Sequence, residues 1–222
     1  MIYAPNDTAI PFDLSDPNAL VQLNSNFMGF FLSTDILPIL QNPLCVGVRI
    51  YHVVDGTNAG HPTQLLAVGA LADGSDDIQT YKQANGTSPA HSLDRTNALT
   101  IANPYHNDSY MSFFSRDVIT ELVQNGPVDG FSIFASTLAH VNDSDFQNNQ
   151  SNDLVTRKAQ VMTHVIAPMN LVNGMIPFLS STDITRTSIH PCPGHCVKMN
   201  DINFDPEIST PTSTNDPYLF DW

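Results

Sequence analysis

The chain has 222 residues, of which 41% are hydrophobic and 14% are charged, and its formal net charge is −14. This length suits one large domain or two small ones with a hydrophobic core. Eight scattered lysine and arginine residues cannot replace the counterions of a nucleic acid, and an anionic membrane surface is disfavoured for the same reason. The composition therefore argues against nucleic-acid binding. It also requires contacts between copies to be apolar, hydrogen-bonded or bridged by cations.

The sequence carries no targeting segment that we recognise. Residues 1–16 contain neither a basic region nor the apolar stretch of a secretory signal. No apolar run approaches the roughly 20 residues that cross a bilayer. We therefore expect no membrane insertion and a chain that is cytoplasmic at synthesis. Release or surface exposure as part of a particle stays open, because a surface rich in Asn, Ser, Thr and Gln is typical of such proteins.

An internal repeat organises the chain. The run that begins at Phe31 matches the run that begins at Phe113 with an offset of 82 as far as Leu40, and with an offset of 83 thereafter. We therefore expect two diverged copies flanked by two arms. The expected units are an N-terminal arm at 1–15, copy one at 16–90, copy two at 91–172 and a Pro-, Ser- and Thr-rich C-terminal arm at 173–222.

Copy one predicts two helices followed by two strands. Asp16, with a proline after it, marks the first helix start. Asp35 at the N-cap of the second helix leaves Pro38 in the first turn, where its missing N–H costs little. Apolar runs at 46–54 and 64–71 predict the strands.

Copy two repeats this order. Asp94 and Asp117 mark its two helix starts, and 130–137 and 159–166 are its predicted strands. The fold class expected is therefore α+β: an internally duplicated α-α-β-β unit, an antiparallel sheet with helices on one face, and an irregular C-terminal arm. The sequence does not decide whether the copies share one sheet.

The densest group of metal-ligating residue types is a short segment near the C-terminus, formed by His190, Cys192, His195 and Cys196. Thiolates and imidazoles suit Zn²⁺, so zinc is the cofactor this segment could take. A local disulfide between Cys192 and Cys196, or simple turn chemistry, is the favoured alternative. Redox catalysis is disfavoured, because the spacing is C-x3-C and not C-x2-C.

Three other features favour structural roles. Residues 73–77 are acidic, but they lack the glycine and the glutamate of a calcium loop, so we expect a turn and no calcium. Arg49 lies in an apolar strand and needs a partner, which favours an ion pair or exposure at a sheet edge over substrate binding. Cys45 is expected to pack as a small apolar residue.

No catalytic motif stands out. Asp35 and Asp117 are better explained as helix caps than as an acid and base pair, and no phosphate loop or nucleophile elbow occurs. The remaining histidines show no ligand spacing: His52, His61, His91, His106, His140 and His164. These observations lean against an enzyme.

The end of the C-terminal arm, from Asn203 to Trp222, has the composition of a segment that does not fold alone. It finishes with Tyr218, Phe220 and Trp222, and aromatic residues at a chain end favour docking into a groove. We expect this arm to dock on its own subunit or on a neighbouring one, within a homo-oligomer.

The chain resembles a family of small uncharacterised proteins from Bacteroidota. The resemblance rests on motifs in the region 16–78 and on a short segment near the C-terminus. The matching residues are Phe30-Phe31, Asp35 to Leu40, Cys45 to Tyr51, Leu65 to Asp76 and Pro191 to Cys196. Copy two follows the pattern more loosely, without the equivalents of Cys45 and Arg49. The resemblance implies the repeated unit and carries no known activity.

Three functions follow from these observations. A structural or assembly protein, forming a homo-oligomeric, filamentous or particulate complex, fits the duplication, the polar uncharged surface and the lack of catalytic motifs. A metal- or ligand-binding module would use the segment from His190 to Cys196. An enzyme with a site between the copies is the least supported.

Overall fold

The computed structural model of the protein describes residues 9–55, 63–72, 75–77, 81–84, 90–102, 110–140 and 162–189. They form an α+β fold in which antiparallel strands build two five-stranded sheets, so the predicted fold class is confirmed. No helix in this part of the chain is both long and apolar enough to span a bilayer.

Sheet A has the strand order β1-β10-β9-β8-β2. Its strands in that order are Ala9–Ile10, Arg186–Ser188, Met162–Met169, Gly130–Thr137 and Phe27–Leu32. Sheet B has the order β6-β5-β4-β3-β7. Its strands in that order are His91–Leu93, Tyr81–Ala84, Thr63–Leu71, Cys45–Val54 and Tyr110–Ser115. The helices are Pro17–Ser25 (α1), Ser33–Ile36 (α2), Arg95–Ala102 (α3) and Arg116–Val123 (α4), with 3-10 turns at Ile39–Gln41 (η1) and Leu138–His140 (η3).

The two sheets are related by the internal repeat. The elements β1-α1-β2-α2-β3-β4-β5 recur in the same order as β6-α3-β7-α4-β8-β9-β10. Each sheet contains strands from both repeats, because β2 pairs with β8 and β7 pairs with β3. β1 pairs with β10 in the same way as β6 pairs with β5. β1 lies within the expected N-terminal arm and β10 within the expected C-terminal arm.

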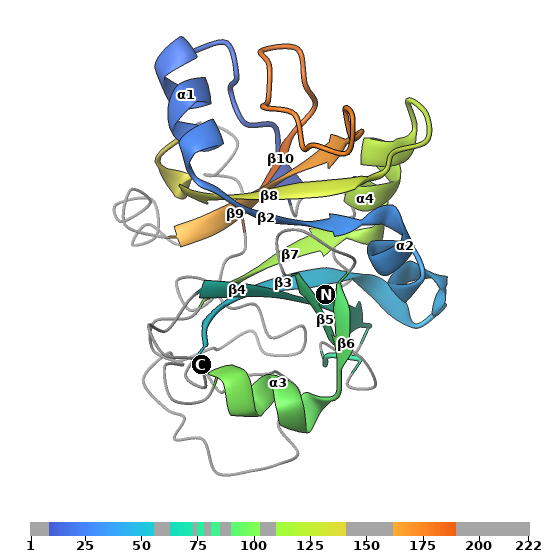
Figure 1. Ribbon diagram of the computed structural model, residues 1–222. Coiled ribbons are helices and arrows are strands. Elements are labelled where there is room, and N and C mark those ends of the chain that lie inside the picture. The colour runs from blue at the N-terminus through green and yellow to red at the C-terminus, as the bar shows by residue number, and fades with distance from the viewer. Residues whose placement is uncertain are drawn as a thin grey trace, which may run out of the picture.

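The sheets face each other across the main hydrophobic core, which the short helices α2 and α4 close at one side. The outer face of sheet A packs on α1, and the outer face of sheet B packs on α3. Figure 1 shows α1 and α3 at opposite ends of this stack. The alternation of side chains along each strand therefore supplies one apolar set to the central core and another to the covering helix.

Strand pairing corrects the repeat alignment. Gly47 pairs with Ser115 and Gly130 pairs with Leu32, so a single offset of 83 relates α2 and β3 to α4 and β8. The predicted offset of 82 before Leu40 is wrong, and no residue was gained or lost at the helix end. The offset of 82 matches Ser33 with Ser115 and Asp35 with Asp117. These matches are false, because the serine and the aspartate that cap the two helices stand at different positions.

The capping residues show why. Asp35 does not begin a helix: Leu32 is the N-cap of α2, and the Asp35 carboxylate accepts hydrogen bonds from the Leu32 and Ala90 N–H groups at 3.1 and 3.3 Å. In α4 the N-cap is Ser115, whose hydroxyl accepts from the Val118 N–H. Both arrangements satisfy a free N–H at the helix start.

Most of the other predicted elements are confirmed, but one strand is shifted and the strand between the two helices of each repeat was not predicted. Asp16 caps α1 with Pro17 as its first residue, as expected, and Asp94 accepts the Asn97 N–H at 2.8 Å at the start of α3. The strands predicted at 46–54, 64–71 and 130–137 are present. The strand predicted at 159–166 runs from Met162 to Met169, three residues later. The α-α-β-β pattern also omitted β2 and β7, which lie between the two helices of each repeat.

Candidate functional site

A group of polar side chains is buried where the two sheets meet, and we call it the inter-sheet cluster. On β3 and β7 its members alternate with core residues, and on β9 two of them are adjacent. They are His52 of β3, Tyr110 and Ser112 of β7, Thr163 and His164 of β9, and Ser188 of β10. All except His52, which is partly exposed, are buried. The strand pairing that forms the sheets therefore brings together residues that are far apart in the sequence.

Hydrogen bonds and stacked rings hold this cluster together. His164 Nδ1 lies 2.9 Å from Ser112 Oγ, which also accepts the His164 N–H at 3.0 Å. Tyr110 stacks on His52 and on His164 with ring centroids 4.6 and 4.7 Å apart. Ser112 and His164 are a hydroxyl beside an imidazole, but both are fully buried, so neither is exposed to a substrate.

Burial shifts the titration of the three rings. It lowers the pKa of His52 to about 4 and holds the pKa of His164 well below its ordinary value, with a smaller contribution from His52 beside it. Burial also raises the pKa of Tyr110. At neutral pH all three rings are uncharged, as a site enclosed between two sheets requires.

A second buried network lies under α3, on the outer face of sheet B. The Arg49 guanidinium donates to Asp76 at 2.5 Å, and the hydroxyls of Tyr51 and Tyr81 donate to the same carboxylate at 2.8 and 3.0 Å. Arg95 in turn donates to the Tyr81 hydroxyl at 3.3 Å. The ion pair predicted for Arg49 is confirmed, and its partner comes from the acidic stretch 73–77. Because the four core members are fully enclosed, this network stabilises the fold and offers nothing to a ligand.

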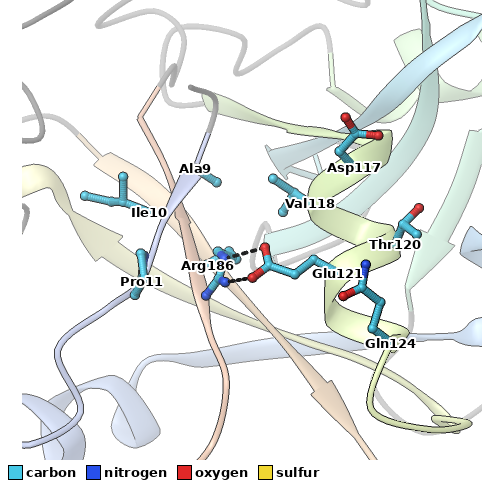
Figure 2. A pocket seen from close by; sticks show the side chains of 9 residues that line it. All are labelled: Ala9, Ile10, Pro11, Asp117, Val118, Thr120, Glu121, Gln124 and Arg186. Atoms are coloured by element: carbon cyan, nitrogen blue, oxygen red, sulfur yellow. Dashed lines mark hydrogen bonds and ion pairs between the residues drawn. The ribbon is translucent and has the colours of Figure 1, made fainter. Parts of the chain in front are cut away.

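A groove of about 550 Å³ runs between β1 and α4 (Figure 2), and we call it the α4 groove. Arg186 lies across it and pairs with both carboxylate oxygens of Glu121, while its Nη1 donates to the Thr185 carbonyl at 2.8 Å. The residues that line it are Ala9, Ile10, Pro11, Asp117, Val118, Thr120, Glu121, Gln124 and Arg186.

The charges of the α4 groove limit what it could bind. Its single cation, Arg186, is already neutralised by Glu121, and Asp117 adds a second carboxylate. Asp183 lines the adjoining hollow. An anionic ligand would meet more negative than positive charge, which costs free energy. The groove is therefore unsuited to phosphate or carboxylate substrates.

Four of the five most exposed large apolar side chains in the described residues lie on α1 or on the segment that connects β9 to β10, and the fifth is Leu44. The four are Val21 on α1 (67% exposed), Val172 (56%), Met175 (67%) and Phe178 (83%). No charged residue occurs from 17 to 34 or from 159 to 182. We call the exposed part of α1 together with residues 170–182 the uncharged face. In a chain of net charge −14 this is an unusual surface.

The uncharged face is built rigidly. Asn173 and Gly174 both have positive φ, at 53° and 76°, and Val172 and Met175 exchange backbone hydrogen bonds of 2.9 and 3.0 Å around them. This is the Asn-Gly turn with positive φ at both central residues that tight hairpins prefer. Asn24 of α1 holds the end of the segment by donating to and accepting from the Leu179 backbone at 3.0 and 2.8 Å.

The sequence-predicted metal ligands cannot be compared with this geometry. His190, Cys192, His195 and Cys196 lie outside the described residues, as does the arm from Asn203 to Trp222. The zinc site and its disulfide alternative therefore both stay predictions. Within the described ranges, no three His, Cys, Asp or Glu side chains gather as a metal site would need. Cys45 is a buried free thiol, as expected, and burial raises its pKa to about 11.

Searches of protein-family models, curated proteins and solved structures found nothing that matches this chain. The resemblance to the Bacteroidota family therefore stays a prediction. Function has to be argued from the chain's own residues.

Sequence reasoning missed both the inter-sheet cluster and the uncharged face. The cluster had a signal, because His52, Ser112 and His164 each stand two residues from a buried apolar residue of the same strand and so share its inward side. The face also had one, in the long uncharged stretch that contains Asn173 and Gly174. Neither signal takes the form of a short motif.

Proposed function

We propose that this protein is a structural or assembly protein that associates with copies of itself through the uncharged face. The observation that carries the proposal is the exposure of Val172 and Met175 on a tight Asn-Gly hairpin and of Phe178 just after it. Exposed apolar residues that are already ordered lose little conformational entropy when a partner covers them.

Charge favours a second copy as the partner. Two chains of net charge −14 repel each other, and the repulsion is smallest where no carboxylate must be brought close to another. Residues 17–25 and 170–182 carry no charge of their own, and the carboxylates beside them, Asp129 and Asp183, accept the Leu171 and Ser180 N–H groups at 2.8 and 2.6 Å. Burying Met175 and Phe178 in such a contact would contribute about 1.5 to 3 kcal/mol for each side chain.

The C-terminal arm supplies the second part of the proposal. Its last stretch, from Asn203 to Trp222, would dock on its own subunit or on a neighbour and so extend the contact into a larger homo-oligomeric, filamentous or particulate complex. The support is its aromatic end.

The first test is the mass of the full chain in solution, measured by light scattering after size exclusion. We expect an oligomer at micromolar concentration. The double variant Met175→Ser with Phe178→Ser should weaken association about a hundredfold or more. A matched control is Leu44→Ser, which removes a side chain of similar exposure (65%) outside the uncharged face and should assemble like the original chain.

A strictly monomeric full chain would refute the proposal, and so would equal weakening by Leu44→Ser. The arm is tested separately by a chain that ends at Ile189, since this chain keeps β10 and every other described element. If this shortened chain forms the same oligomer as the full one, the arm does not contribute to assembly.

A further inference from the structure

The edge strand β7 is attached to sheet A through the inter-sheet cluster, and we call this attachment the β7 seam. The Phe113 N–H donates to Ser188 Oγ at 3.2 Å, and the His164 N–H donates to Ser112 Oγ. The Thr163 hydroxyl donates to the Ser188 carbonyl at 2.7 Å and lies 3.3 Å from Ser112 Oγ. Side chains on β7, β9 and β10 therefore join one sheet to the edge of the other.

The hydrogen bonds of the β7 seam fix the proton on His164. Thr163 uses its hydroxyl hydrogen for the Ser188 carbonyl, so Ser112 must be the donor in the contact between the two hydroxyls. Ser112 Oγ then accepts from both the backbone N–H and the Nδ1–H of His164. The Nε2 of His164 carries a lone pair instead of a hydrogen, and this atom has no partner.

A second imidazole in the seam is in a similar state. His52 Nδ1 is buried without a partner, and the His52 ring centroid lies 6.5 Å from that of His164. The strand neighbours of the two rings are Leu65 of β4 and Ala135 of β8, with Tyr110 of β7 stacked between them. Met28 of β2 accepts from the Tyr110 hydroxyl at 3.6 Å. Among these described neighbours the only titratable groups are Tyr110 and the other histidine, and none is an anion.

β2 is the edge strand of sheet A, as β7 is of sheet B. Its attachment to sheet B, which we call the β2 seam, is apolar. The strand pairing shows which residues are equivalent. Gly29 of β2 stands where β7 has Ser112. Leu65 of β4 stands where β9 has His164, and Ala84 of β5 stands where β10 has Ser188. A Cβ built on Gly29 would lie 3.4 Å from Leu65 and 3.9 Å from Ala84. The same backbone arrangement is therefore closed by apolar contact at β2 and by neutral imidazoles at β7.

We propose that the β7 seam is an acid-sensitive device: protonation of His52 and His164 releases β7 from sheet A while β2 stays attached. A proton on His164 would place a charge and an N–H without an acceptor in a fully buried site. A proton on His52 would add a second positive charge 6.5 Å away. The apolar β2 seam contains nothing that takes up a proton in this range.

The direction of the pH dependence follows from the pKa shifts. Both histidines have pKa values below the ordinary 6.5, with His52 at about 4, so the closed seam binds fewer protons than the open one. Its stability is complete above pH 6.5 and falls as the pH drops toward 4. Each histidine should raise the open population by up to about tenfold per pH unit within that window.

Amide hydrogen exchange of the full chain at pH 7.5 and pH 5, corrected for the intrinsic rate, tests this. We expect the amides of Phe113 and His164, which the seam binds, to lose protection at pH 5 while Phe27–Leu32 keeps it. The variant Ser112→Gly with His164→Leu copies two residues of the β2 seam into β7 and should reduce the acid response to the part that His52 contributes. His52→Ala, which copies Ala135, should reduce it and serves if the double variant does not fold.

His91→Ala is the matched control, because His91 is exposed on β6, and it should leave the response unchanged. Three results would overturn the proposal. One is equal loss of protection in β2 and β7, which would indicate global unfolding. The second is unchanged protection of β7 at pH 5. The third is an acid response that is undiminished in the folded Ser112→Gly, His164→Leu variant or in His52→Ala.

Discussion

The β2 seam and the β7 seam occupy equivalent places, yet they hold the two sheets together by different chemistry. Gly29 packs against Leu65 in one, whereas Ser112 is hydrogen-bonded to His164 in the other. The outer faces of the sheets differ too. Arg49 is ion-paired under α3, and its equivalent under α1 is Ser132. The duplication therefore preserved the backbone arrangement and let the buried polar groups diverge.

The connection after the second long strand of each repeat diverged as well. In copy one the short link from β4 to β5 supplies Asp76 to the buried ion pair. In copy two the longer link from β9 to β10 forms the hairpin at Val172 to Met175. One connection turns inward to stabilise a sheet, and the other presents apolar side chains at the surface. Specialised features of this molecule are thus found where the copies differ.

The largest expected effect comes from breaking the polar network that only one copy has. Arg49→Leu should lower the free energy of unfolding by about 3 to 5 kcal/mol, because Asp76 would keep a buried charge without its cation. Urea unfolding measures this. The double variant Arg49→Leu with Asp76→Leu should recover much of the loss, since no buried charge remains. A double variant as unstable as the single one would contradict this account.

A smaller effect should be the same in both copies. A Cβ on Gly47 would lie 2.3 Å from the Phe114 carbonyl oxygen, and a Cβ on Gly130 would lie 2.3 Å from that of Phe31. Gly47→Ala and Gly130→Ala should each cost about 1 to 3 kcal/mol in urea unfolding, because the paired strands must move apart. Costs that differ by more than about 1 kcal/mol would show that the two strand pairs are less alike than their pairing indicates.

The smallest effect concerns Cys45, whose equivalent in copy two is Val128 at the offset of 83. Cys45→Val should change the free energy of unfolding by less than about 1.5 kcal/mol, since the thiol is buried and serves as a small apolar group. Its pKa of about 11 keeps it protonated at neutral pH. A much larger loss in urea unfolding would mean that the contact from Cys45 Sγ to Asp77, at 4.0 Å, matters to the fold.

The fold was predictable where local chemistry determines it. Asp16 and Asp94 cap helices as expected, and the long apolar runs of β3, β4 and β8 form strands. The strand β2 was missed because Phe27–Leu32 is a nearly continuous apolar run without alternation, placed directly between two helices. Only its pairing with β8, about a hundred residues later, makes it a strand.

The repeat alignment failed for a different physical reason. A free N–H at a helix start can be satisfied by a side chain at the N-cap, as with Ser115, or by one three residues further on, as with Asp35. Matching serine to serine and aspartate to aspartate therefore shifted the repeats by one residue. The inter-sheet cluster could not be found by spacing, because strands from different repeats bring its members together.

The exchange of strands between the copies also governs the order in which the chain can fold during synthesis. Sheet B is complete once β7 has been made, whereas β1 and β2 must wait for β10 and β8. β2 ends at Leu32 and β8 begins at Gly130, so at about 5 to 20 residues per second the interval between them is on the order of ten seconds. For that time the apolar edge of β2 has no partner strand, and an unpaired edge of this kind is a template for aggregation. Because its first strands pair only with strands that are made much later, this protein depends on the cell to prevent aggregation while it is being synthesised.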